Sequence, residues 1–104
     1  MSLSTTFSAL SDPTRRAVVE RLSRGEATIG ELAEPHDMSL PAFTKHIGVL
    51  VDAGVVTRRK VGRTVICSLA SDSLDEAAAW ITDRTAFWNV TLDRLERLVT
   101  EENP

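Results

Sequence analysis

A single cysteine, Cys67, and the absence of any long apolar run are the first features of this 104-residue sequence. One cysteine excludes an internal disulfide and fits a reducing environment. The N-terminus does not resemble a signal peptide, and no stretch is apolar for long enough to cross a bilayer. We therefore expect a cytoplasmic protein with no membrane partner.

The residue groupings that carry enzyme chemistry are also missing. The sequence has no glycine-rich phosphate loop, no spacing typical of metal ligands, and no serine, histidine and aspartate that can be assigned to a triad. Residues 72–104 contain neither histidine nor cysteine. We expect no enzyme activity, no cofactor and no metal. His36 is expected in a solvated turn, His46 on the core side of its helix, and Cys67 among buried apolar residues.

The charge of the chain is unevenly distributed. The net charge is −3, yet residues 35–70 carry five Lys and Arg side chains against two Asp, a net +3. Residues 71–104 carry three arginines against eight acids, a net −5. The cationic middle favours a nucleic-acid partner, whereas the acidic tail weakens non-specific DNA binding. With 42% hydrophobic and 26% charged residues, the composition is that of one globular domain over residues 1–104.

A helix over residues 40–53 is the element from which function can be inferred. Ser39 is a good N-cap, and Pro41 is tolerated because first-turn N–H groups have no intrahelical partner. Apolar residues fall on one side of this helix and small or polar residues on the other. The inward set is Phe43, Ile47, Leu50, Val51 and Gly54; the outward set is Pro41, Lys45, Gly48 and Asp52, with Thr44 on the flank.

A β-hairpin with a cationic tip follows this helix. Its strands are predicted at residues 55–60 and 64–69, joined by a turn at 61–63. An α-helix with a small, polar exposed face fits the major groove of DNA, and hairpin cations can reach the backbone phosphates beside it. We expect DNA contacts from Leu40, Pro41, Thr44 and Lys45 of the helix, and from Arg58, Arg59, Lys60 and Arg63 of the hairpin.

Two helices are predicted at the start of the chain. The first covers about residues 2–10, and Asp12-Pro13 begins a second that runs to about Arg24. Arg15 and Arg16 lie in the first turn of the second helix, where the helix dipole disfavours cations. We therefore expect these two arginines to have acidic or phosphate partners.

A third, short helix precedes the helix over residues 40–53. Thr28 and Glu31 form a capping box at its start, and Pro35 ends it. A short helix, a tight turn and a second helix have the geometry of a helix-turn-helix.

The last helix is unusually long. Ser73 and Glu76 are predicted to form a capping box, and an apolar pattern then continues from Leu74 to Val99 without a helix-breaking residue. The resulting helix of about 27 residues would be roughly 40 Å long, which exceeds the span of a small domain. A second copy of the chain is the simplest cover for its apolar stripe.

The sequence resembles the ArsR-type (ArsR/SmtB) winged helix-turn-helix regulators along nearly its whole length. The matching segments are residues 7–16 (FSALSDPTRR), 30–33 (GELA), 39–47 (SLPAFTKHI) and 53–56 (AGVV). The resemblance implies a mainly α fold with a small β-hairpin, in which four helices precede the wing and a fifth follows it. It also implies a homodimer joined through its first and last helices. The implied interface residues are Leu3, Phe7, Ile81, Trp88, Leu92, Leu95 and Val99.

Two departures from the family pattern bear on function. Metal-sensing members carry two cysteines, one residue apart, where this chain has Thr28 and Gly30. Other members bind zinc through the last helix, which here has no histidine, so the sequence is similar to the metal-independent branch. Relatives often have glutamine at the position of Leu40 and arginine at that of Gly48. Leu40 makes no bidentate base contact, but it can touch a thymine methyl.

The expected function is that of a homodimeric repressor that binds a palindromic operator through the helix over residues 40–53 and the wing over 55–69. Two alternatives remain open: a winged helix used for protein–protein interaction, and a repressor controlled by an unidentified organic ligand. Salt dependence separates the first alternative from DNA binding, because a wing that binds protein need not show a steep dependence.

Overall fold

The structure is a computed structural model that describes residues 2–102 and the side chains of residues 2–100. Four of its helices begin at a residue whose side chain caps the helix N-terminus. Asp12, Thr28 and Ser39 each accept a hydrogen bond from the backbone N–H three residues later, as their sequence contexts predict. Glu31 returns the bond to the Thr28 amide and completes the capping box. The helices are α1 (Leu3–Ala9), α2 (Pro13–Leu22), α3 (Ile29–Ala33), α4 (Leu40–Asp52) and α5 (Ser71–Glu102).

Two predicted helix boundaries are wrong. Helix α2 ends at Leu22 rather than near Arg24, because the chain turns through Gly25 at φ 133°, which favours glycine. Helix α5 begins at Ser71, and Ser73 lies inside it. The Ser73 hydroxyl donates to the carbonyl oxygen of Ala53 at 3.2 Å, so it ties α5 to the end of α4 instead of capping a helix.

The β-structure is a three-stranded antiparallel sheet in the order β1-β3-β2. Strands β2 (Val56–Val61) and β3 (Thr64–Leu69) form the predicted hairpin, which we call the wing. Because Val61 pairs with Thr64, the turn consists of Gly62 and Arg63 alone, and Gly62 has a left-handed φ of 64°. The two-residue strand β1 (Ala27–Thr28), which no pattern in the sequence predicts, pairs with β3 and anchors the wing to α3.

The inner face of α4 lies at the centre of the core, as predicted. Phe43, Ile47 and Leu50 are fully buried. Cys67 is also fully buried, as expected, and desolvation raises the pKa of its thiol. Burying this face against the other elements fixes the opposite face of α4 toward solvent, because the two faces lie on one rigid helix. The remaining core side chains include Val18, Leu22, Leu32, Val55 and Val56.

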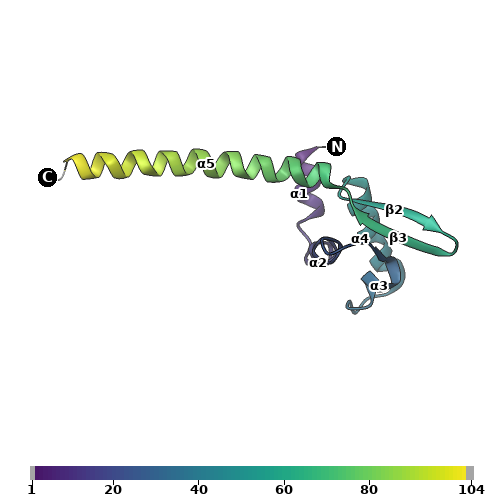
Figure 1. The fold of residues 1–104 in the computed structure, drawn as a ribbon. Coiled ribbons are helices and arrows are strands. Elements are labelled where there is room, and N and C mark those ends of the chain that lie inside the picture. The colour runs from purple at the N-terminus through teal and green to yellow at the C-terminus, as the bar shows by residue number, and fades with distance from the viewer. Residues whose placement is uncertain (1, 103–104) are drawn as a thin grey trace.

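Helix α5 extends far beyond the other elements as a single rod (Figure 1). It has 32 residues, more than predicted, and it stretches the molecule to 72 Å along its longest axis. The start of α5 contacts the remainder of the chain: Ala77 is buried, and Trp80 meets Phe7 of α1 edge-on at 5.8 Å between ring centroids. Among the described residues, no helix combines the length and apolar character needed to cross a membrane.

Candidate nucleic-acid interface

The exposed face of α4 carries the predicted contact residues of this helix. Leu40, Pro41 and Lys45 are exposed, and Thr44 is half-buried beside them. Leu40 is the most conspicuous of the four, since 58% of an apolar side chain faces solvent at the first position of the helix.

Two open hollows flank this face of α4, and each brings in a cation from the wing. The first, of about 540 Å³, places Arg58 of β2 beside Lys45. The second, of about 520 Å³, places Arg63 of the wing turn beside the start of α3. Leu40 and Thr44 line both hollows. The structure therefore brings together six of the eight predicted DNA-contact residues: Leu40, Pro41, Thr44, Lys45, Arg58 and Arg63.

The remaining two wing cations, Arg59 and Lys60, lie on opposite faces of the wing, because successive side chains of a strand alternate between its faces. Arg58 lies opposite the buried Cys67 and Lys60 opposite Val65, so both occupy the face of the wing that turns toward α4. Arg59 lies opposite Ile66 on the other face. Lys60 is exposed and extends the cationic edge, whereas Arg59 is directed away from it.

Arg59 forms an ion pair with Glu26, which is not among the predicted site residues. The guanidinium donates to both carboxylate oxygens, at 2.8 and 3.0 Å, and the Ser68 hydroxyl donates to the same carboxylate at 3.1 Å. These hydrogen bonds, that from Arg59 first, lower the pKa of Glu26 to about 2. The ion pair neutralises the charge of Arg59 and fixes the wing to the segment before β1. No sequence signal marks Glu26, because the two partners are 33 residues apart.

Arg15 connects α1, α2 and α4. Its guanidinium donates to the carbonyl oxygens of Ala9 and Ser8, at 2.6 and 3.3 Å, and lies 3.1 Å from Nδ1 of His46. Arg16 likewise donates to the carbonyl oxygen of Leu10 at 2.9 Å. Neither arginine forms an ion pair with an acidic side chain among the described residues, so the expected acidic partners were wrong. Both arginines instead bind carbonyls at the end of α1, where the helix dipole favours cations.

The two histidines are both half-buried. Nδ1 of His46 lies 3.1 Å from the Arg15 guanidinium and 3.7 Å from an Asp12 carboxylate oxygen. The hydrogen bond from the backbone N–H of Arg15 is the main reason that the pKa of the Asp12 carboxyl lies below its ordinary value. His36 is not a freely solvated turn residue, because its ring stacks on Phe43 at 5.5 Å and is half-buried.

The predicted interface residues of α5 lie on one exposed apolar face. They recur at spacings of three, four or seven residues and therefore share one side of the helix. Leu3 and Phe7 of α1 are only half-buried and lie near the start of this face. The exposed members of α5 are Ile81, Trp88, Leu92, Leu95 and Val99.

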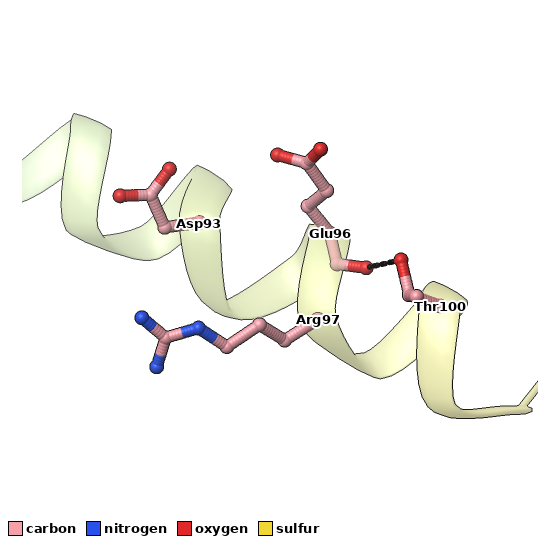
Figure 2. Close-up of a pocket in the computed structure, with 4 residues that line it drawn as sticks. All are labelled: Asp93, Glu96, Arg97 and Thr100. Carbon is pink, nitrogen blue, oxygen red and sulfur yellow. Dashed lines mark hydrogen bonds between the residues drawn. The ribbon is translucent and has the colours of Figure 1, made fainter.

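Within the part of the chain that the structure describes, no three His, Cys, Asp or Glu side chains are grouped to hold a metal ion. A shallow hollow near the end of α5 is lined by Asp93, Glu96, Arg97 and Thr100, all from this one helix (Figure 2). Thr100 there donates to the carbonyl oxygen of Glu96 at 2.9 Å, so its hydroxyl serves the helix backbone.

Comparisons with known proteins agree with this fold. Residues 10–59 match a family described as a helix-turn-helix domain. The chain is 38% identical, over 92% of its length and 87% of the relative, to Rv2034, an HTH-type transcriptional regulator of Mycobacterium tuberculosis. It is 33% identical to the transcriptional repressor SdpR of Bacillus subtilis, over 72% of this chain and 83% of that one. A crystal structure of an ArsR family transcriptional regulator superposes with a TM-score of 0.78 at 46% identity, over 84% of this chain and 90% of that one.

Proposed function

Because this chain belongs to the ArsR family of winged helix-turn-helix regulators, it is a DNA-binding transcriptional regulator rather than an enzyme, and we propose that it is a homodimeric repressor that binds a palindromic operator. Repression is supported by SdpR, which is itself named as a repressor. We further propose that the protein acts in the cytoplasm, where it would meet chromosomal DNA.

The observation that carries the DNA-contact proposal is the position of four cations that form no ion pair with the other described residues. Lys45 and Arg58 meet at one hollow beside α4, Arg63 lies at the other, and Lys60 extends the same face of the wing. This cationic surface stands on a chain whose net charge is −3. Arg59, the one cation of the wing that faces away, is neutralised by Glu26. The charges are therefore arranged for a polyanion on one side only.

The two elements of this surface suit two different parts of a duplex. An α-helix fits the major groove, where the outward residues of α4 would meet base edges. The wing would then lie against the adjoining backbone, where its cations contact phosphates and carry no sequence information. A twofold dimer presents two such surfaces, so the operator would contain two inverted half-sites.

The first experiment is selection of bound sites from random duplex DNA, followed by anisotropy measurements across a range of salt concentrations. If each subunit neutralises two to four phosphates, the dimer has a log–log salt slope of roughly −4 to −7. Lys45→Ala reduces that slope by about one per subunit if Lys45 contacts phosphate. If Lys45 instead reads guanine, discrimination at one position per half-site falls by about 1–3 kcal/mol.

The Arg63→Ala variant distinguishes a contact to backbone phosphate, which positions the protein, from a contact to a base, which carries sequence information. A phosphate contact carries no base information, so this variant weakens binding to the selected and scrambled duplexes alike. Arg97→Ala, which removes an exposed arginine far along α5, is the matched control and leaves both affinities unchanged. A slope near zero, or no preference for the selected duplex, would show that the winged helix serves a protein partner instead.

A further inference from the structure

Leu40 and Thr44 form a ridge between the two hollows of the DNA-contact surface, and we call this pair the Leu40–Thr44 ridge. Both residues line both hollows, so the ridge is bounded by Lys45 and Arg58 on one side and by Arg63 on the other. A duplex held by these cations would have its base edges over the ridge. The ridge is therefore placed to read sequence rather than backbone.

Several of the hydrogen-bond donors around this ridge are engaged within the helix. The Thr44 hydroxyl donates to the carbonyl oxygen of Leu40 at 2.8 Å. The amide of Ala42 donates to Ser39 Oγ at 3.2 Å, the amide of Phe43 to the Ser39 carbonyl oxygen at 3.0 Å, and Pro41 has no N–H. The ridge therefore presents methyl groups to solvent instead of donors.

The chemistry of the major groove limits what such a surface can recognise. Every base pair offers hydrogen-bonding groups there, but among the four standard bases only thymine offers an apolar group, its C5-methyl. Leu40 is 58% exposed, so it has apolar surface to bury against that methyl. Resting on the proposed function, we infer that the Leu40–Thr44 ridge reads a thymine methyl in each operator half-site.

The test on the DNA side uses the duplex selected by the wild-type protein. Each thymine is replaced by uracil, one symmetric pair of positions at a time, which removes only the methyl group. Burial of one methyl corresponds to about a fourfold change in affinity, so one position per half-site loses about fourfold and the other positions change little. At that position, 5-methylcytosine paired with guanine binds about fourfold more tightly than cytosine, because the methyl is restored.

The test on the protein side removes the other partner of the contact. Leu40→Ala binds the thymine and uracil duplexes equally, because the variant no longer contacts the methyl. Val90→Ala is the matched control: it truncates an apolar side chain of α5 that is 50% exposed, and it keeps the wild-type preference for thymine. Circular dichroism checks that Leu40→Ala is folded, and the uracil series on the wild type needs no variant.

Three results would overturn the inference. In the first, the wild type prefers the selected duplex to a scrambled one but tolerates uracil at every position, which leaves the proposed function intact. In the second, Leu40→Ala retains the full thymine preference, which assigns the methyl contact to another residue. In the third, the wild type shows no preference for any duplex, and the proposed function fails together with the inference.

Discussion

Arg59 of the wing donates hydrogen bonds to both carboxylate oxygens of Glu26, at 2.8 and 3.0 Å, on the face of the sheet that turns away from α4. The wing therefore has two faces with different roles. One face joins the wing to the segment before β1, and the other carries Arg58 and Lys60 toward the DNA-contact surface. Arg59 is thus a positioning residue, because it sets where the free cations lie.

The Glu26 carboxyl provides a pH-dependent test of this ion pair. Its pKa is lowered from an ordinary 4.5 to about 2, chiefly by the hydrogen bonds from Arg59. Because the folded pKa is the lower one, the stabilisation is fully present above pH 4.5 and is lost as the pH falls through 2. Glu26→Gln therefore lowers the melting temperature at pH 7, and the deficit shrinks only below about pH 4.5. The deficit is small, since both side chains are half exposed.

Melting curves of the wild type and Glu26→Gln between pH 7 and pH 3 measure this deficit, and carboxyl NMR follows Glu26 itself. Glu20→Gln is the control, because Glu20 is an exposed acid of α2 and lies outside the ion pairs formed by the described residues. A Glu26 titration midpoint near 4.5 would show that the pair is absent in solution.

The two faces of the wing predict different salt behaviour for adjacent arginines. Arg58→Ala removes a free cation beside Lys45, so it reduces the log–log salt slope of DNA binding by about one per subunit. The Glu26→Gln/Arg59→Ala double variant removes the ion pair without changing the net charge, so it keeps the slope. Anisotropy titrations across salt distinguish the two variants. Equal losses of slope would mean either that Arg59 leaves Glu26 to bind phosphate or that the ion pair is needed to position Arg58 and Lys60.

A capping pattern in the sequence predicted the start of a helix correctly only where the capping side chain does not bond to a distant part of the chain. The pattern Thr28-x-x-Glu31 forms a capping box, whereas the equivalent pattern Ser73-x-x-Glu76 does not. A capping box needs residues three apart, so the pattern shows that a helix can begin there. Whether it does begin depends on packing: the Ser73 hydroxyl reaches Ala53, 20 residues earlier, and the helix starts upstream.

The site could be predicted in outline for a similar reason. The face of α4 follows from the spacing of its apolar residues, and strand alternation indicates that neighbouring wing cations face opposite ways. Which face meets α4 could not be predicted, because it depends on the pairing of β3 with both β1 and β2. Strand β1 has only two residues, too few to show an alternating pattern, so Glu26 could not be recognised as the partner of Arg59.

Metal independence is a further prediction. Thr28 and Gly30 offer no thiolate, and the Thr28 hydroxyl oxygen already accepts the amide of Glu31 at 3.1 Å. Soft and borderline metals need thiolate or imidazole ligands for tight binding. Calorimetry with zinc is therefore expected to show no tight stoichiometric binding, and a chelator should leave the affinity for the selected duplex unchanged. A submicromolar zinc site that releases DNA would contradict this prediction.

The apolar face of α5 predicts a dimer. Trp88 is 60% exposed and Val99 65%, and Leu92 and Leu95 lie between them on the same side of the helix. An apolar face of this length is rarely left in water by a stable monomer. Light scattering should therefore give twice the chain mass of 11.4 kDa. Leu92→Asp combined with Leu95→Asp places charges in the contact, so the protein should dissociate or unfold.

A control on the same helix separates loss of the interface from loss of helix stability. Thr82→Asp combined with Asn89→Asp adds the same two charges to exposed positions on the polar side of α5, and this variant should remain a dimer. Tryptophan emission gives a second readout, because Trp88 leaves an apolar environment only when the subunits separate. A wild-type mass of about 11 kDa would exclude the dimer. Equal dissociation of both double variants would instead mean that added negative charge, and not the apolar face, controls association.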